Sequence, residues 1–271
     1  MKKKIQAGFI QFRPLLGDTE SNMKKLSRMI SQCREADLMV IPELANSGYN
    51  FTSGDQALEL AEEINRSSFI EFLIAEAAEK NIFIVAGMNE KDGHDLFNTA
   101  VLICPQRGLR GKYRKIHLFM DEKDIFKPGN LGLPLFDIGI CRLGMLICFD
   151  WIFPEVWRIL ALKGADVICH PSNLVLPFAQ QAVPVHGMVN RTFVITANRI
   201  GTEREITFSG ESIISDPLGK TLAKASSDRE EVLFTWLDIG MARDKMITRR
   251  NHAFDDRMPE EYLPLIDPGK N

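Results

Sequence analysis

The chain has 271 residues, of which 45% are hydrophobic and 25% charged, as in an ordinary soluble globular protein. Its net charge of −3 implies no basic face, so we expect no nucleic-acid partner. No apolar stretch approaches the roughly 20 residues that a membrane-spanning helix needs, and the N-terminal segment is too polar for a signal peptide. These features predict a cytoplasmic protein with no membrane partner.

The cysteines and histidines show no metal-ligand spacing. The five cysteines are odd in number, scattered, and contain no CxxC pair, which predicts free thiols in a reducing compartment and no zinc site. The histidines likewise lack ligand spacing; they are His94, His117, His170, His186 and His252. We therefore expect no metal site.

In the first half of the chain, strand-like and helix-like patterns alternate. Apolar residues on alternate positions predict a strand over 4–12, and an apolar stripe at helical spacing predicts a helix over 19–35 with Asp18 or Thr19 as its cap. The remaining predicted elements of this half are strands at 38–41, 81–88 and 99–104 and a helix at 67–80.

The second half continues the alternation. Pro154 and Gly164 are suited to the start and end of a helix. Strands are predicted at 135–139, 142–147, 167–169, 194–197, 212–215, 221–223 and 231–237, with a turn at 216–219. There is no internal repeat or linker, so we expect one domain over 1–271 with an extended C-terminal tail from about 249.

Three predicted buried runs end in a reactive side chain. Glu43 follows a strand and a proline, Cys148 follows an apolar run, and Lys115 lies in a short basic segment. Sites in α/β proteins are built where strands end. A lysine beside a cysteine favours the thiolate and stabilises an oxyanion, and a carboxylate takes the thiol proton. Together the three provide a nucleophile, a base and an electrostatic stabiliser for acyl transfer.

Each residue alone has a simpler interpretation. A cysteine in an apolar strand commonly packs as a small hydrophobic residue, and a lysine in a basic run is commonly a solvated charge. Glu43 could serve only as a cap. Cys148 differs from the other four cysteines because Phe149 and Asp150 follow it directly. Only the combination indicates a catalytic site.

Together the three segments resemble the nitrilase superfamily of carbon–nitrogen hydrolases. The family pattern matches here as PE…GY at 42–49, KxHLF at 115–119, CFD at 148–150 and FPE at 153–155. The family's second glutamate matches Glu122, which Asp121 and Asp124 flank and which precedes FKPG at 126–129. The resemblance covers nearly the whole chain, with the motifs in the family's order.

The resemblance implies an α/β fold in the form of a four-layer α-β-β-α sandwich, subunits that pair into a homodimer or higher homo-oligomer, and no cofactor. It implies that Glu43 is the base, Cys148 the nucleophile, Lys115 the oxyanion stabiliser together with the Phe149 N–H, and Glu122 a group that orients substrate and Lys115. The expected substrate-binding residues are Tyr49, Phe119, Phe149, Trp151 and Asn173, with Leu174 and Phe178 as further pocket candidates.

Several functions remain open at this point. The preferred one is hydrolysis of a small, mainly neutral amide to an acid and ammonia through a thioester on Cys148. The alternatives are hydrolysis of a small nitrile or of an N-carbamoyl amide, a papain-like site of Cys148, His170 and Asn173, and a binding subunit without activity. Arg191 or Arg199 would be available if the substrate carried a carboxylate.

Overall fold

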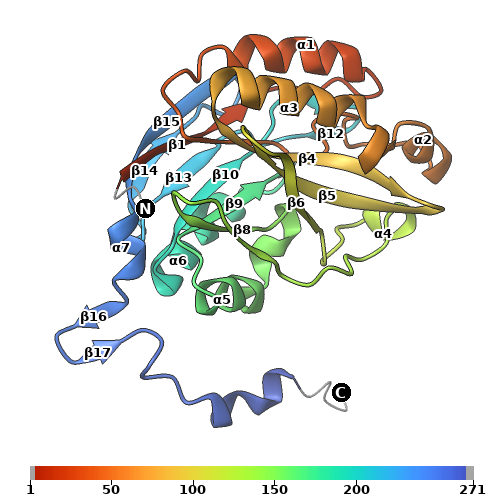
Figure 1. The fold of residues 1–271 in the computed structure, drawn as a ribbon. Coiled ribbons are helices and arrows are strands. Elements are labelled where there is room, and N and C mark those ends of the chain that lie inside the picture. Colours follow the sequence, from red (N-terminus) through yellow and green to blue (C-terminus); the bar gives the residue numbers. More distant parts are fainter. Residues whose placement is uncertain (1–3, 267–271) are drawn as a thin grey trace.

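The computed structural model describes residues 4–266 and contains two large β-sheets packed face to face (Figure 1). The first sheet has the strand order β15 (Glu231–Asp238), β1 (Lys4–Gln11), β2 (Leu38–Ile41), β4 (Phe83–Asp92), β5 (Asp95–Cys104) and β6 (Gly108–Arg114), with β3 (Glu62–Glu63) paired to β4. The second has the order β14 (Thr221–Lys224), β13 (Ile213–Ser215), β10 (Phe193–Ala197), β9 (Val167–Pro171), β8 (Arg142–Met145) and β7 (Leu135–Asp137).

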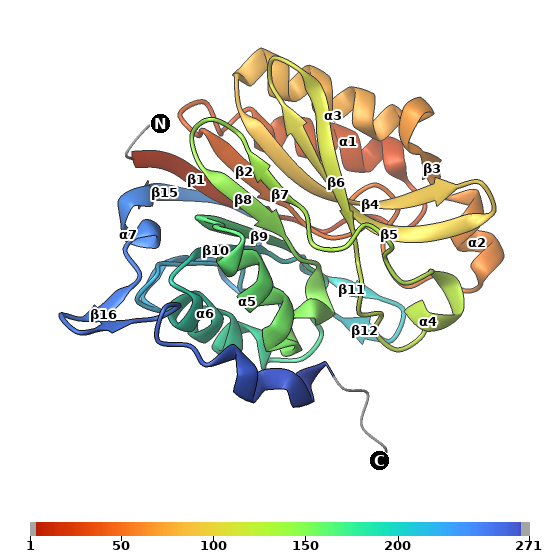
Figure 2. The same cartoon turned by 60° about the horizontal axis from the view of Figure 1, so that its bottom comes forward.

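The two sheets repeat one topology. In each, three neighbouring strands are parallel, β1-β2-β4 in the first and β8-β9-β10 in the second, and antiparallel strands flank them. Helices α1 (Thr19–Ile30) and α3 (Ser68–Lys80) cover the outer face of the first sheet, and α5 (Pro154–Leu162) and α6 (Ala179–Asn190) cover that of the second (Figure 2). The predicted four-layer α-β-β-α sandwich is confirmed.

Burial on both faces explains the apolar runs of the central strands. In β2, Val40 packs into the core between the sheets, whereas Met39 and Ile41 pack into the core beneath α1 and α3. In β4, Val85 packs into the core between the sheets and Ile84 packs into the core beneath α1 and α3. Successive side chains of a strand point to opposite faces, so a strand that is covered on both sides has no polar position.

The sequence signals for where helices begin and end were mostly correct. Asp18 caps α1 by accepting a hydrogen bond from the Ser21 N–H, and Ser67 caps α3 in the same way through the Ile70 N–H. Helix α1 ends at Ile30 and not at residue 35, because Cys33 is buried and a turn over residues 29–36 directs the chain toward β2. None of the helices within residues 4–266 is long and apolar enough to cross a membrane.

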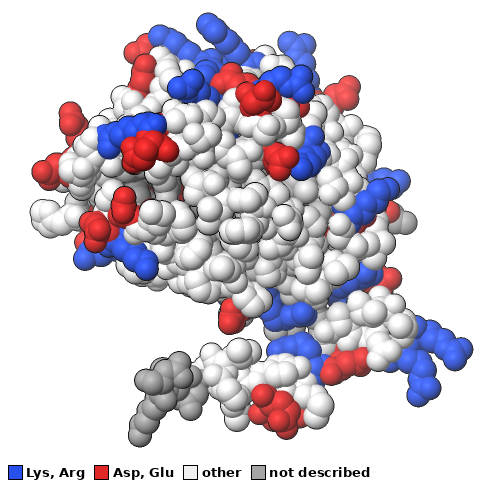
Figure 3. Space-filling view, turned by 180° about the vertical axis from the view of Figure 1, so that it is seen from behind, with Lys and Arg blue, Asp and Glu red and all other residues white. Residues whose placement is uncertain are grey.

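Smaller elements complete the described chain. They are α2 (Gly54–Glu59), η1 (Ile64–Arg66), α4 (Glu122–Ile125), η2 (Cys148–Ile152), the hairpin β11 (Thr202–Glu203)–β12 (Ile206–Thr207), α7 (Ile239–Arg243), the hairpin β16 (Met246–Thr248)–β17 (Asn251–His252) and η3 (Pro259–Leu265). The segment after α7 contacts the body through Lys245, which donates to the Arg191 carbonyl, and through Phe254, whose ring lies beside Arg158, whereas its later part stands away from the body (Figure 3). A cavity of about 670 Å³ lies between this segment, α5 and the end of α6.

Candidate active site

The buried Lys115 side chain contacts both Glu43 and Glu122. Lys115 follows β6, and its Nζ lies 2.8 Å from Oε1 of Glu43 and 2.7 Å from Oε1 of Glu122. All three side chains are almost completely buried. Asp121 and Asp124, the neighbours that made the position of the second glutamate uncertain, are exposed. The structure therefore distinguishes Glu122 from its neighbours by contact with Lys115.

The backbone around Glu43 is held by a close contact with β4. A Cβ atom on Gly87 would lie 2.3 Å from the Glu43 Cα, so only glycine fits there. The Gly87 N–H donates to the Pro42 carbonyl, and the Ala45 N–H donates to the Gly87 carbonyl. Leu44 has a φ of 49°, a left-handed conformation that is uncommon for a leucine. This strained turn fixes the direction in which Glu43 leaves the sheet.

Among the described residues, hydrogen-bond donors contact one of the two Glu43 carboxylate oxygens and not the other. Oε1 accepts from Lys115 Nζ and, at 2.6 Å, from Nδ2 of Asn98. Oε2 is buried and has no hydrogen-bond partner within residues 4–266. A buried carboxylate oxygen without a donor is unusual, and it is available to accept a proton.

Cys148 stands in a strained turn directly after the second sheet. It begins η2 with a φ of 42°, again in the left-handed region. Asp150 fixes this turn, because its Oδ2 accepts from the Ile147 N–H at 2.8 Å. A sharp turn of this kind directs a side chain away from the strand that precedes it.

The Cys148 thiol holds its proton tightly. Burial is the main cause that raises its pKa well above the ordinary value, and the charge of Glu43 raises it further. Lys115 and the Asn173 N–H act in the opposite direction. A thiol in this setting is not a preformed thiolate, so a base must remove its proton as it reacts.

The charges around Lys115 keep the ammonium group protonated. Burial lowers the Lys115 pKa, but the charges of Glu122 and Glu43 outweigh it, and the net shift is upward. Burial raises the pKa of Glu122 to about 7, while Lys115 opposes the rise. The Tyr49 hydroxyl donates to Glu122 Oε1 at 2.9 Å, and burial raises the pKa of that hydroxyl well above its usual value.

His170 lies close to Cys148 but does not face its sulfur. Its Nε2 lies 2.9 Å from the Cys148 main-chain oxygen, and its Nδ1 lies 3.0 Å from Thr196 Oγ1. Burial lowers its pKa to about 4, so the ring is neutral at pH 7. The geometry gives the papain-like alternative no base at the thiol.

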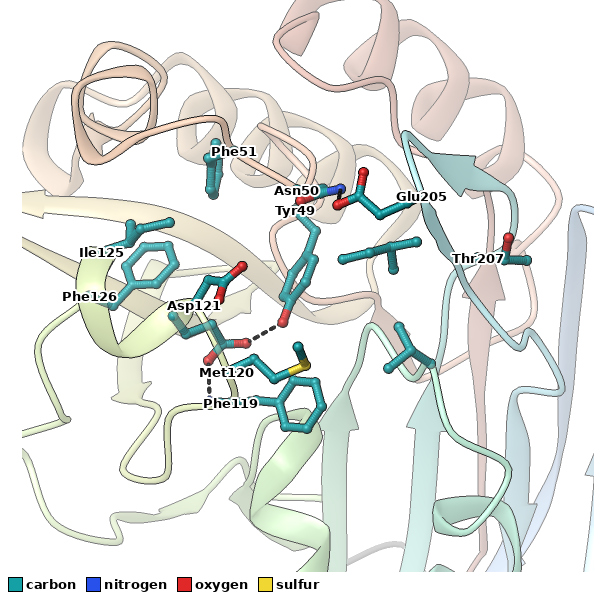
Figure 4. Close-up of a pocket in the computed structure, with 13 residues that line it drawn as sticks. Tyr49, Asn50, Phe51, Phe119, Met120, Asp121, Ile125, Phe126, Glu205 and Thr207 are labelled. Carbon is teal, nitrogen blue, oxygen red and sulfur yellow. Dashed lines mark hydrogen bonds between the residues drawn. The ribbon is translucent and has the colours of Figure 1, made fainter.

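Two cavities with shared lining residues border Cys148 and Glu122. A small one of about 30 Å³ contains Cys148 and is lined by Phe149, Trp151, Asn173 and Leu174. A larger one of about 290 Å³ is lined by Tyr49, Glu122 and several apolar side chains (Figure 4). Phe119 and Val175 line both. The five expected substrate-binding residues thus all border one or both cavities, whereas Phe178 lines neither and is 55% exposed.

Some contacts of the site had no signal in the sequence analysis. Asn98 lies in the middle of β5, and Gly87 lies in the middle of β4. Neither belongs to a motif with reactive side chains, so only their positions in the folded sheet identify them. Within residues 4–266, no group of three or more His, Cys, Asp or Glu side chains is arranged to hold a metal ion.

An α-β-β-α sandwich with a buried thiol, an ammonium group and two carboxylates is typical of an acyl-transferring hydrolase. Comparison with known proteins agrees. The carbon-nitrogen hydrolase family model matches residues 6–245. The chain is 43% identical to a nitrilase from Pyrococcus abyssi, over 96% of this chain and 99% of that protein. It is 31% identical to an (R)-stereoselective amidase from a Pseudomonas species, over 78% of this chain and 77% of that protein.

The solved structures give the same result. A crystal structure of a carbon-nitrogen hydrolase from Helicobacter pylori G27 matches with a TM-score of 0.89 and 27% identity, over 98% of this chain and 99% of that one. The chain belongs to the carbon–nitrogen hydrolase family of the nitrilase superfamily. It is an enzyme of the amidase and carbon–nitrogen hydrolase type.

Proposed function

We propose that this enzyme hydrolyses a small amide to a carboxylic acid and ammonia through a thioester on Cys148. The observation that carries the proposal is the state of the Glu43 carboxylate. Oε1 is held by Lys115 and Oε2 has no partner among the described residues, while the Cys148 thiol, on which the Glu43 charge acts, has a raised pKa and requires a base. No metal or organic cofactor has a role in this reaction.

In the first half-reaction Glu43 takes the proton of Cys148 as the sulfur attacks the amide carbon. The carbonyl π electrons move to oxygen, and the Lys115 ammonium and the Phe149 N–H stabilise the resulting oxyanion. Glu43 then gives its proton to the departing nitrogen. The C–N bond breaks, ammonia leaves, and a thioester remains on Cys148.

In the second half-reaction water replaces ammonia. Glu43 takes a proton from the water as its oxygen attacks the thioester carbon, and the same donors stabilise the oxyanion. The C–S bond breaks, the proton returns to the sulfur, and the carboxylic acid leaves. Glu122 orients the substrate and holds Lys115, and the Tyr49 hydroxyl supports Glu122 in turn.

The residues that line the cavities favour a small substrate whose end remote from the amide is uncharged. The charged side chains that line the two cavities are Asp121, Glu122 and Glu205, and no lysine or arginine lines either. Arg199 is buried against Glu203, and Arg191 donates to main-chain carbonyls. A substrate carboxylate would therefore meet carboxylates and no lysine or arginine among the described residues that line the two cavities.

A nitrile is the second candidate, because a relative 43% identical to this chain is named a nitrilase. The same site would add the Cys148 sulfur to the nitrile carbon and give a thioimidate. Addition of water and loss of ammonia would then lead to the same thioester. N-carbamoyl amides are a third group, in which attack of the Cys148 sulfur on the carbamoyl carbon breaks a C–N bond, releases the amine with the proton from Glu43 and leaves an S-carbamoyl thiocarbamate.

The test is ammonia release from a panel of aliphatic and aromatic primary amides, N-carbamoyl compounds and nitriles, each in neutral and carboxylate-bearing forms. Cys148→Ala is the inactive variant and Cys169→Ala its control, because Cys169 is equally buried but lies within β9. We expect release from neutral amides by the wild type and Cys169→Ala alone. Turnover of nitriles alone would favour the second candidate, and turnover of carboxylate-bearing amides alone would contradict the proposed substrate class.

We further propose one domain over residues 1–271 whose C-terminal tail from about 249 takes part in a homodimer or larger oligomer. Several exposed apolar side chains of α5, α6 and the tail support this; they are Ile159, Leu162, Val185, Met188, Val189, Leu263, Leu265 and Ile266. Five free thiols support a reducing compartment, so the cytoplasm remains the proposed location.

A further inference from the structure

We propose that Asn98 is a positioning residue for Glu43. It holds one carboxylate oxygen so that the other faces the reacting thiol. This inference rests on the proposed function, in which Glu43 is the base.

The side chain of Asn98 forms the shortest of the described contacts to Glu43. Nδ2 lies 2.6 Å from Oε1, and Lys115 Nζ lies 2.8 Å from the same oxygen. Asn98 is only 1% exposed, so water does not compete for this hydrogen bond. In the described part of the chain Oε1 has two donors and Oε2 has none, so the protein fixes which oxygen is free to accept a proton.

The main chain of Asn98 also contacts the lysine segment. Its carbonyl accepts from the Lys115 N–H at 2.8 Å, just beyond the end of β6. One residue of β5 therefore touches the carboxylate of Glu43 and the backbone of Lys115. This arrangement sets the separation of the base and the ammonium group independently of the bond between them.

The side-chain oxygen of Asn98 also supports a positioning role. Oδ1 is buried and has no partner among the described residues. A buried amide oxygen without a donor lowers stability, and an apolar side chain at this position would avoid that cost. Among the described residues, the side-chain hydrogen bond of Asn98 that offsets this cost is the one to Glu43.

The experiment measures alkylation of Cys148 by iodoacetamide as a function of pH, by intact mass, with Cys148→Ala as the background. It compares Asn98→Ala, the similarly shaped Asn98→Asp, Glu43→Gln and Asn89→Ala. Asn89 is the matched control, because it lies opposite Asn98 on β4, is equally buried and bonds to Ala57 and Asn46 instead. Circular dichroism checks that each variant is folded.

Without the Asn98 donor, Lys115 alone among the described residues holds Oε1, and the orientation of the Glu43 carboxylate is no longer fixed. We therefore expect Cys148 to be alkylated more slowly in both Asn98 variants across the pH range. On the amide that the panel turns over fastest, kcat falls about 10- to 100-fold with little change in KM, the equivalent of one hydrogen bond to a charged group. Asn89→Ala keeps the wild-type alkylation rate and kcat.

The outcomes separate this inference from the function on which it rests. If Glu43→Gln alkylates at the wild-type rate across the pH range, Glu43 is not the base and the proposed mechanism fails. If Glu43→Gln is slow but the folded Asn98 variants match Asn89→Ala in alkylation rate and kcat, the mechanism stands and the positioning role of Asn98 is overturned.

Discussion

Nδ1 of His117 lies 2.7 Å from Oδ1 of Asp150. This contact joins the segment that carries Lys115 to the turn that begins at Cys148. The Tyr113 hydroxyl donates to the other oxygen of Asp150 at 2.8 Å. Lys115 precedes His117 by two positions, and Cys148 precedes Asp150 by two positions. The contact between His117 and Asp150 therefore gives the KxH and CxD patterns a common physical basis.

Asp150→Ala is expected to destabilise the fold and not only the reaction. Asp150 is completely buried, and its loss leaves the Tyr113 hydroxyl and the Ile147 N–H without an acceptor. We expect a fall of about 3 kcal/mol in the free energy of unfolding, measured with urea. Asp228→Ala, at an exposed position, is the control. Equal stability of the two variants would contradict the structural role of Asp150.

Glu122 predicts a pH dependence of stability. Its pKa is about 7 in the folded chain and 4.5 in the reference state, so the folded state keeps a proton that the unfolded state loses. Stability that is present below pH 4.5 is therefore lost as the pH rises toward 7. Urea unfolding across this range should show a steeper decline for the wild type than for Glu122→Gln.

The control for this prediction is Glu59→Gln, because Glu59 is exposed on α2. It should follow the wild type at every pH. A wild-type curve parallel to that of Glu122→Gln would contradict the raised pKa.

His170→Gln distinguishes the proposed site, in which Glu43 is the base, from the papain-like alternative, in which His170 would be the base. The neutral ring lies against the Cys148 main-chain oxygen and not the sulfur, so we expect kcat at pH 7 to fall by less than about tenfold. A folded variant as inactive as Cys148→Ala would instead restore the cysteine–histidine alternative.

The same variant tests the lowered pKa of His170. The ring is neutral in the folded state down to about pH 4 but takes a proton near 6.5 in the reference state. Stability that is present above pH 6.5 is therefore lost as the pH falls toward 4. The acid-induced loss between these values should be smaller in His170→Gln, and an unchanged loss would contradict the assignment.

Removal of residues after Arg249 tests the proposed assembly. The tail carries Leu265 and Ile266, whose exposed fractions are 68% and 80%. We expect the truncated chain to sediment as a smaller species than the full chain. Leu58→Glu, at an exposed apolar position on α2, should leave sedimentation unchanged. If truncation has no effect, the tail does not hold the subunits together.

The sequence predicted much of the fold because each element carries its own local signal. The strand over 38–41 has the predicted bounds, and the helix that follows Pro154 begins where expected. Helix α6 contains Pro184 and lacks such a signal, so its bounds were not predicted. Strand β6 mixes glycine with lysine and arginine, and its pairing with β5 depends on the fold.

The candidate site was predictable only where reactive side chains lie in recognisable motifs. Glu43, Lys115 and Cys148 each follow a strand, and the contact of Lys115 with Glu122 then distinguishes that glutamate from its acidic neighbours. Asn98 lies in the middle of a strand between ordinary residues. Its contact with Glu43 spans 55 positions of the chain and exists only through the pairing of strands.

The measurement that tests the central claim most directly is intact-mass analysis of the enzyme quenched in acid during amide turnover, followed by peptide mapping. The account predicts an acyl adduct on Cys148, removed by hydroxylamine as a thioester is, in the wild type and in Cys169→Ala. It predicts none in Cys148→Ala. Continued release of ammonia by Cys148→Ala, or an adduct on another residue of the active wild type, would contradict it.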